Sequence, residues 1–178
     1  MIEFKGKIKG KKEEVEKVLD CFKKASNHQF VVPYKDDVEE EVERAKNFYT
    51  ADTPHFWNIL GVEVVSQGME DKEYVVDLKG LCSENLADSL LKRGAQRVWG
   101  KYKSSDWFKG TSLEDVHKKF PELKVELFSV DLKEGFSEHV LVSEYGVEDE
   151  VEDFCVALPE WFKMAHLDFL GYEVVYNI

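Results

Sequence analysis

The chain has 178 residues, 43% of them hydrophobic, and a net charge of −12 at pH 7. A chain of this size buries about 70% of its unfolded surface, so we expect residues 1–178 to form one domain with its own core. No run of about 18 apolar residues occurs, so no helix is expected to cross a bilayer. The acidic balance favours solubility and disfavours general attraction to nucleic-acid backbones.

The N-terminal sequence and the cysteines favour the cytoplasm. The opening MIEFKGKIKGKKEE contains no apolar stretch with a small-residue cleavage site, so we expect no secretory signal. Cys21, Cys82 and Cys155 are odd in number, far apart and outside any C-x-x-C pair. This pattern argues against a disulfide framework and a four-thiolate zinc site. We expect a reduced, cytoplasmic protein without a cofactor.

The first third of the chain predicts a strand followed by helices. Residues 2–9 alternate apolar and polar side chains, as in a strand with one solvated face. Residues 11–25 place apolar side chains at helical spacing, which predicts a surface helix packed on a sheet. A second helical stripe is predicted as an insertion at 36–58. The apolar stripe of the first helix consists of Val15, Val18, Leu19, Phe22 and Ala25.

The middle of the chain predicts a hairpin and two further helices. Residues 61–82 are expected to form a hairpin of two apolar arms joined by a turn at Gly68–Asp71. Ser83 is expected to cap a short helix. Thr111 and Glu114 have the spacing of a capping box for the next helix. The apolar stripe of the Ser83 helix consists of Leu86, Ala87, Leu90 and Leu91.

The remaining residues predict a meander and a C-terminal extension. Strands are expected at 124–132, 136–145 and 150–157, and a helix and strand at 159–178. Antiparallel hairpins with interspersed helices indicate the α+β class. We therefore predict a ferredoxin-like antiparallel sheet with helices mainly on one face, whose core spans 1–157, followed by the C-terminal extension.

Three segments of the sequence carry a resemblance to a known family. They are IEFKGKIKGKKEEVEKVLDCF, VDLKGLCSENLADSLL and KVELFSVDLKEGFSEHVLVSEYG. The second contains a Gly-x-Cys step before a helix, and the third has Glu138 and His139 after the aromatic Phe136. In these features the chain resembles the YubB-type ferredoxin-like domain of bacterial, plasmid and phage proteins. The resemblance implies a fold and a mobile-element context, and it carries no catalytic residues.

Glu138 and His139 are the candidate acid and base. Consecutive residues of a strand point to opposite faces of its sheet, so the two side chains are not expected to act on one substrate as a direct pair. Catalysis would need a further group from another strand. The alternative is a buried glutamate with a hydrogen-bond partner beside a polar strand residue. No zinc-hydrolase, P-loop, dinucleotide-binding or serine-hydrolase motif supports the catalytic interpretation.

The segment 92–109, KRGAQRVWGKYKSSDWFK, differs in character from the rest of the chain. It carries six cations and one acid, with aromatic side chains between them. Cations interleaved with aromatics are typical of surfaces that bind single-stranded nucleic acid or an acidic protein. The alternative is a connection pinned to the core by its aromatics. The candidate binding residues are Arg93, Arg97, Trp99, Lys101, Tyr102, Lys103 and Trp107.

The segment 143–153 is acidic, and a solvated hairpin end is the simplest interpretation. Glu148, Glu150 and Glu152 are spaced two apart, which would suit a calcium or magnesium ion if the segment were a loop. The full calcium-loop pattern is absent. The acidic segment of one molecule could instead meet the basic segment of another in a homodimer.

These features favour a non-catalytic protein-interaction module of phage or mobile-element origin, with an unidentified protein partner. Two alternatives stay open. One is an enzyme that acts on a small molecule or nucleotide through Glu138 and His139. The other is an acidic mimic of nucleic acid or a binder of single-stranded nucleic acid.

The cysteine pattern predicts that the chain contains no intramolecular disulfide. Alkylation of freshly purified, denatured protein under thiol-blocking conditions should modify all three cysteines, as read by mass spectrometry. Fewer than three modified thiols would overturn the prediction of a reduced protein.

Overall fold

The computed structural model describes most of the predicted sheet. Of the sequence predictions, the helix at 36–58 apart from Phe56, the extension at 159–178 and most of segment 92–109 lie outside the described residues. The described residues are 2–26, 56, 59–82, 85–93, 111–131 and 134–153.

The protein is of the α+β class, with one six-stranded antiparallel sheet in the order β2-β3-β1-β4-β5-β6. The predicted strands 2–9, 61–67, 73–80 and 124–132 all lie in this sheet. The elements are β1 (Ile2–Gly10), α1 (Lys12–Ser26), β2 (Ile59–Glu70), β3 (Glu73–Cys82), α3 (Leu86–Leu90), α5 (Leu113–Lys119), β4 (Lys124–Asp131), β5 (Phe136–Ser143) and β6 (Gly146–Asp153).

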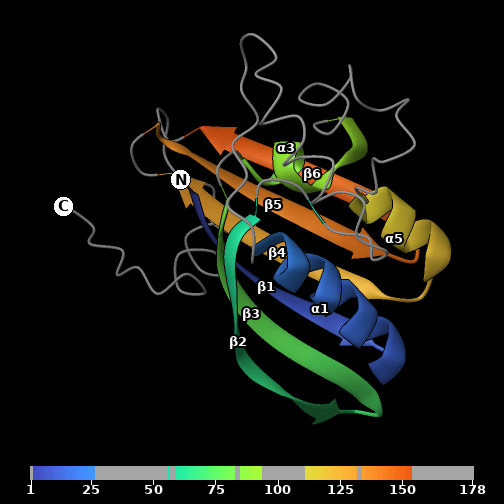
Figure 1. Ribbon diagram of the computed structural model, residues 1–178. Helices are drawn as coiled ribbons and strands as arrows, with labels where there is room; N and C mark the ends of the chain where they lie inside the picture. Colours follow the sequence, from blue (N-terminus) through green and yellow to red (C-terminus); the bar gives the residue numbers. More distant parts are fainter. Residues whose placement is uncertain are drawn as a thin grey trace, which may run out of the picture.

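The central strand β1 separates an inner face from an outer face. Phe4 and Ile8 point inward and are fully buried, whereas Lys5 and Lys7 point outward. The three described helices cover the inner face (Figure 1). None of the helices in the described ranges is long and apolar enough to cross a membrane.

Helix α1 packs on the inner face through the stripe that its periodicity predicts. The Phe22 ring lies between Phe4 and Phe56, with centroid distances of 6.1 and 4.6 Å. Burying each such side chain contributes about 1.5–3 kcal/mol. The Phe56 amide also donates to the Cys21 carbonyl at 3.2 Å, which ties residue 56 to the helix.

The hairpin β2–β3 turns two residues later than the glycine suggested. Gly68 lies within β2, and the turn is formed by Asp71 and Lys72 with φ of 47° and 70°. Two successive positive φ values are typical of a type I′ turn, which matches the twist of the flanking strands. The predicted hairpin is present, but the prediction of its turn at Gly68–Asp71 was wrong in register.

The helix caps and the last strand also differ in position from the predictions. Asn85, rather than Ser83, is the N-cap of α3. The capping box of α5 is formed by Ser112 and Asp115, one residue later than predicted. The third strand of the meander is β6 rather than 150–157, because β5 ends at Ser143 and a short turn leads directly into Gly146.

Val18 of α1 is 1% exposed in the core, so Val18→Asp should lower the free energy of unfolding by about 3–5 kcal/mol, because a buried charge has no partner there. Urea denaturation measures the change. The matched control is Val65→Asp on β2, where the side chain is 59% exposed and the same substitution should change stability by less than about 1 kcal/mol. Equal effects of both substitutions would contradict the packing of α1.

Candidate functional site

Glu138 lies on the inner face of β5 and is 2% exposed. Its carboxylate accepts hydrogen bonds from the backbone amides of Leu86 at 2.6 Å and Ala87 at 3.2 Å. The Ser129 hydroxyl on β4 donates to the same carboxylate at 3.1 Å. β5 is an interior strand, between β4 and β6. The glutamate is thus buried with hydrogen-bond donors, and it does not lie at a sheet edge.

The two amides belong to the first turn of α3. The first amides of a helix have no acceptor within the helix. The Asn85 side chain accepts from the Asp88 amide at 2.7 Å, and Glu138 accepts from the two amides between them. Three successive backbone amides of α3 therefore have side-chain acceptors. The neighbouring Asn85 accepts from one of them, and Glu138 on β5 accepts from the other two.

Burial raises the pKa of Glu138 above its ordinary value of 4.5. The hydrogen bonds from the two amides and from Ser129 act in the opposite direction, because they stabilise the charged form. The nearby carboxylate of Asp88 adds to the rise. Charge repulsion and desolvation together outweigh the donors, so Glu138 holds a proton to a higher pH than an exposed glutamate does.

His139 lies on the outer face, away from Glu138. Its ring stacks on Phe128 of β4 with centroids 4.4 Å apart and ring planes 7° apart. Its Nε2 lies 3.0 Å from the Glu126 carboxylate, also on β4. The hydrogen bond from His139 lowers the pKa of Glu126, and burial opposes this shift. The acid next to His139 in space is therefore Glu126.

The sheet thus separates Glu138 from His139, as their alternation predicts. The pair Glu126 and His139 could serve as a carboxylate and base, but a base acts on a nucleophile within hydrogen-bond reach. Ser137 lies on the same side of β5 as His139, and its buried Oγ has no hydrogen-bond partner. The described residues around His139 do not form a nucleophile–base pair.

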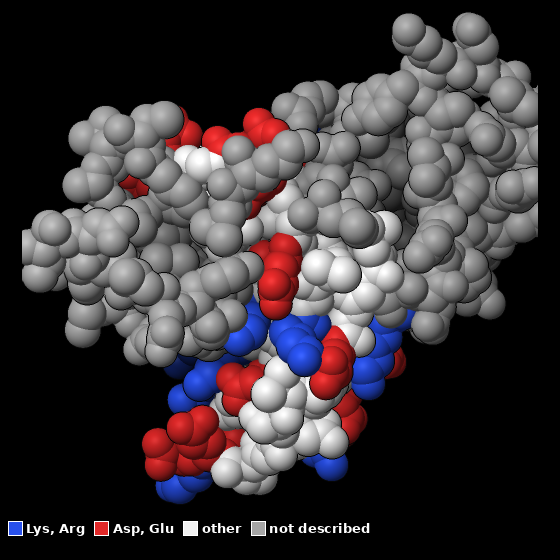
Figure 2. Space-filling view, turned by 90° about the vertical axis from the view of Figure 1, so that its left-hand side faces the viewer, with Lys and Arg blue, Asp and Glu red and all other residues white. Residues whose placement is uncertain are grey.

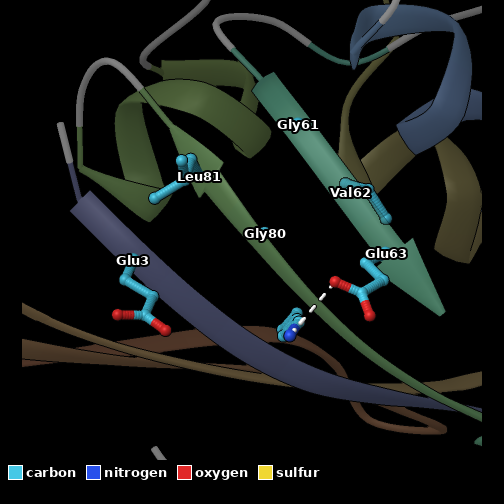
Figure 3. Close-up of a pocket in the computed structure, with 7 residues that line it drawn as sticks. Glu3, Gly61, Val62, Glu63, Gly80 and Leu81 are labelled. Atoms are coloured by element: carbon cyan, nitrogen blue, oxygen red, sulfur yellow. Dashed lines mark ion pairs between the residues drawn. The ribbon is translucent and has the colours of Figure 1, made fainter. Parts of the chain in front are cut away.

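A pocket of about 360 Å³ lies at one end of strands β1, β2 and β3 (Figure 3). The Lys79 ammonium forms an ion pair with Glu63 at 3.1 Å across its wall. Gly80 allows β2 and the Phe4 ring to approach β3 closely, because a Cβ there would lie 2.5 Å from both the Gly61 carbonyl oxygen and the Phe4 ring. The lining residues are Glu3, Gly61, Val62, Glu63, Lys79, Gly80 and Leu81.

A second hollow, of about 180 Å³, lies between α1 and α5 and includes Cys21, Val116 and Phe120 in its lining. Neither this hollow nor the pocket on the sheet is lined by Glu138 or His139. The enzyme hypothesis predicts a deep pocket that contains one of these two residues. The two hollows described by their lining residues do not meet that expectation.

The segment 92–109 begins directly after α3. Leu90 and Leu91 are buried, whereas Lys92 and Arg93 are exposed. The Lys92 amide donates to the Glu114 carboxylate on α5 at 2.9 Å, and the Arg93 guanidinium donates to Asp149 on β6. The other candidate binding residues lie outside the described part: Arg97, Trp99, Lys101, Tyr102, Lys103 and Trp107.

The contact of Arg93 with Asp149 joins the basic and acidic segments within one chain. The sequence suggested this pairing between two chains of a homodimer. Sequence patterns could identify both segments, but they could not show that β6 lies beside the end of α3. The only signal in the sequence for this contact was the opposite charge of the two segments, 92–109 and 143–153.

Most of the acidic segment forms strand β6 rather than a loop, and this argues against a metal site there. Glu148, Glu150 and Glu152 follow one another along the outer face of β6. Residues two apart on a strand are separated by about 7 Å, whereas calcium ligands converge on an ion at about 2.4 Å. The described part of the chain contains no group of three or more histidine, cysteine or acidic side chains that could hold a metal ion.

The chain matches no family model, no curated protein and no solved structure.

Replacing Glu138 by Gln should alter how stability depends on pH. Because the folded pKa is raised, ionisation of Glu138 lowers the unfolding free energy of the wild type as pH rises above about 4.5. Glutamine cannot ionise, so the stability advantage of wild type over Glu138→Gln should shrink as pH rises from about 4 to 8. Urea titrations of both proteins across this range measure the difference.

The other ionisable groups contribute equally to the stability of wild type and variant, so their effect cancels in the difference between the two proteins. An advantage of wild type that grows with pH would show that the three donors stabilise the anion more than burial destabilises it. That result would reverse the assigned direction of the Glu138 pKa shift.

Proposed function

We propose that this protein is a non-catalytic, cytoplasmic protein-interaction module of ferredoxin-like plan, with the basic–aromatic segment 92–109 as its contact surface. The observation that carries the proposal is the abrupt change of environment at the end of α3. The chain passes from the buried Leu91 to the exposed Lys92 and Arg93. The segment therefore begins at the surface, directly after a helix whose first turn is hydrogen-bonded to Glu138 of β5.

The strand order supports the ferredoxin-like plan. The order β2-β3-β1-β4, with α1 between β1 and β2 and with α3 and α5 between β3 and β4, is the arrangement expected of a β-α-β-β-α-β core. Strands β5 and β6 extend that sheet. The resemblance to the YubB-type domains, and with it the phage or plasmid context, remains a prediction.

The anchoring of α3 supports a fixed starting point for the segment, at Lys92 and Arg93. Glu138 holds the first turn of α3, and Glu114 holds the Lys92 amide just after its end. A contact segment on a rigid base loses less entropy on binding than one on a free loop. These contacts favour a binding role over a passive connection.

The test is the substitution of Arg97, Lys101 and Lys103 together by Ser. Stability should change by less than about 0.5 kcal/mol per residue, because surface charges outside special environments contribute little. Capture of partner proteins from bacterial lysate, quantified by mass spectrometry, should fall sharply for this variant. The matched control is Lys11→Ser, Lys12→Ser and Lys118→Ser, which removes three exposed cations elsewhere and should leave capture intact.

Two outcomes would overturn the proposal. A collapse of thermal stability in the segment variant would show that its cations are paired with core acids. Equal loss of capture in the control would show that only net charge matters. Binding of the wild type to a single-stranded oligonucleotide, with a salt slope that flattens in the segment variant, would favour the nucleic-acid alternative instead.

A further inference from the structure

Strand β6 is an edge strand of the sheet formed by the described residues. Within the described sheet it pairs with β5 alone, so its other side presents backbone N–H and C=O groups without a neighbouring strand. Glu148, Glu150 and Asp153 are exposed, and Val151 is 54% exposed. Such an edge is a template on which an extended segment of another chain can add a strand.

The edge at β6 is regular, unlike the opposite edge. Its register runs without a shift from Phe136–Asp153 to Ser143–Gly146. In contrast, β2 has register shifts between Ile59 and Gly61 and between Val64 and Ser66. Bulges, prolines and charged side chains are the usual features that protect an edge from pairing, and of these β6 has only its acidic charges.

The charge of β6 is all of one sign. Five of its eight residues are acidic and none is basic. The outer-face glutamates, 148, 150 and 152, form no ion pair with a cation in the described ranges, whereas Asp149 on the inner face contacts Arg93. The outer face of the strand is therefore negative along most of its length, whereas the inner face alternates valine and aspartate.

This charge distribution indicates what can pair with the edge. Two β6 strands side by side would place like charges opposite each other, which is destabilising, so a second copy of β6 is a poor occupant. A strand with lysine or arginine at alternate positions could place its cations beside Glu148, Glu150 and Glu152 on the outer face. Val151 and Tyr145, which is 85% exposed in the turn before β6, add apolar contact area.

We propose that β6 binds an extended lysine- or arginine-rich segment of another protein, which adds to the sheet as a seventh strand. Backbone hydrogen bonds to the free edge would hold the segment, and the acidic side chains would select its charge. This site meets the contact surface at 92–109 where Arg93 contacts Asp149, but it lies on a different element and carries the opposite charge.

The probe is a fluorescein-labelled eight-residue peptide that alternates lysine and threonine, with binding to the full chain followed by fluorescence anisotropy at low salt. A fully N-methylated counterpart has the same length and charge but cannot donate backbone hydrogen bonds. The unmodified peptide should bind at least about tenfold more tightly than the N-methylated one. Equal affinity of the two peptides, or no binding of the unmodified peptide, would overturn the proposal.

Two sets of variants distinguish binding at the β6 edge from non-specific attraction of a basic peptide to an acidic protein. Glu148→Gln, Glu150→Gln and Glu152→Gln together should weaken binding of the peptide by about tenfold or more. The matched control is Glu13→Gln, Glu70→Gln and Glu122→Gln, which removes the same charge from exposed positions on other elements and should change affinity by less than about threefold.

Hydrogen exchange provides a direct readout of strand addition. The unmodified peptide should slow the exchange of β6 amides and leave those of β2 unchanged, because only the β6 edge would gain a hydrogen-bonding neighbour. Equal weakening in both glutamine variants, or no protection of β6, would show that the peptide is held by net charge alone and would overturn the proposal.

Discussion

A buried carboxylate has to be supplied with hydrogen-bond donors, and in this protein that requirement determines where α3 lies on the sheet. Glu138 has lost its water on the inner face of β5, and the first amides of α3 are the donors that replace it. The helix has only five residues, so its own hydrogen bonds could not hold it in place. One side chain therefore connects β5 to α3, and through α3 to the start of segment 92–109.

Side chains alternate between the two faces of a strand, so Glu138 and His139 have different surroundings although they are adjacent in sequence. Glu138 faces a dry layer of helices, where its role is to satisfy amides. His139 faces the opposite side, where it stacks on Phe128 and hydrogen bonds to Glu126. A dipeptide that suggests acid–base chemistry in sequence is thus divided into a helix anchor and a cross-strand contact. In the described residues, Glu138 and His139 therefore lie on opposite faces of the sheet and do not form one site.

Much of the sheet could be predicted because its signals are local. The alternation in residues 2–9 identified β1, and the helical stripe through Val18 and Phe22 identified α1. Boundaries were harder, since Asp71 and Lys72 form a turn without the glycine that usually marks one. The donors to Glu138 could not be predicted, because Leu86 lies 52 positions away and only the sheet order brings it close.

Charged side chains on the interior strands of the sheet can form ion pairs with those of the neighbouring strands. On the outer face, lysines of β1 lie beside acids of β3 and form the ion pairs Lys7–Asp77 and Lys9–Glu73. Basic and acidic side chains likewise lie next to each other on the described surface in Figure 2.

Mixed charges of this kind contribute little stability and present no single sign to a partner. Strand β6 differs because it has a neighbour on one side only, and its acids find few cations within the described chain. Arg93 partly compensates one of them from the inner face. The same chain therefore presents a neutralised sheet surface in its interior strands and an uncompensated negative edge.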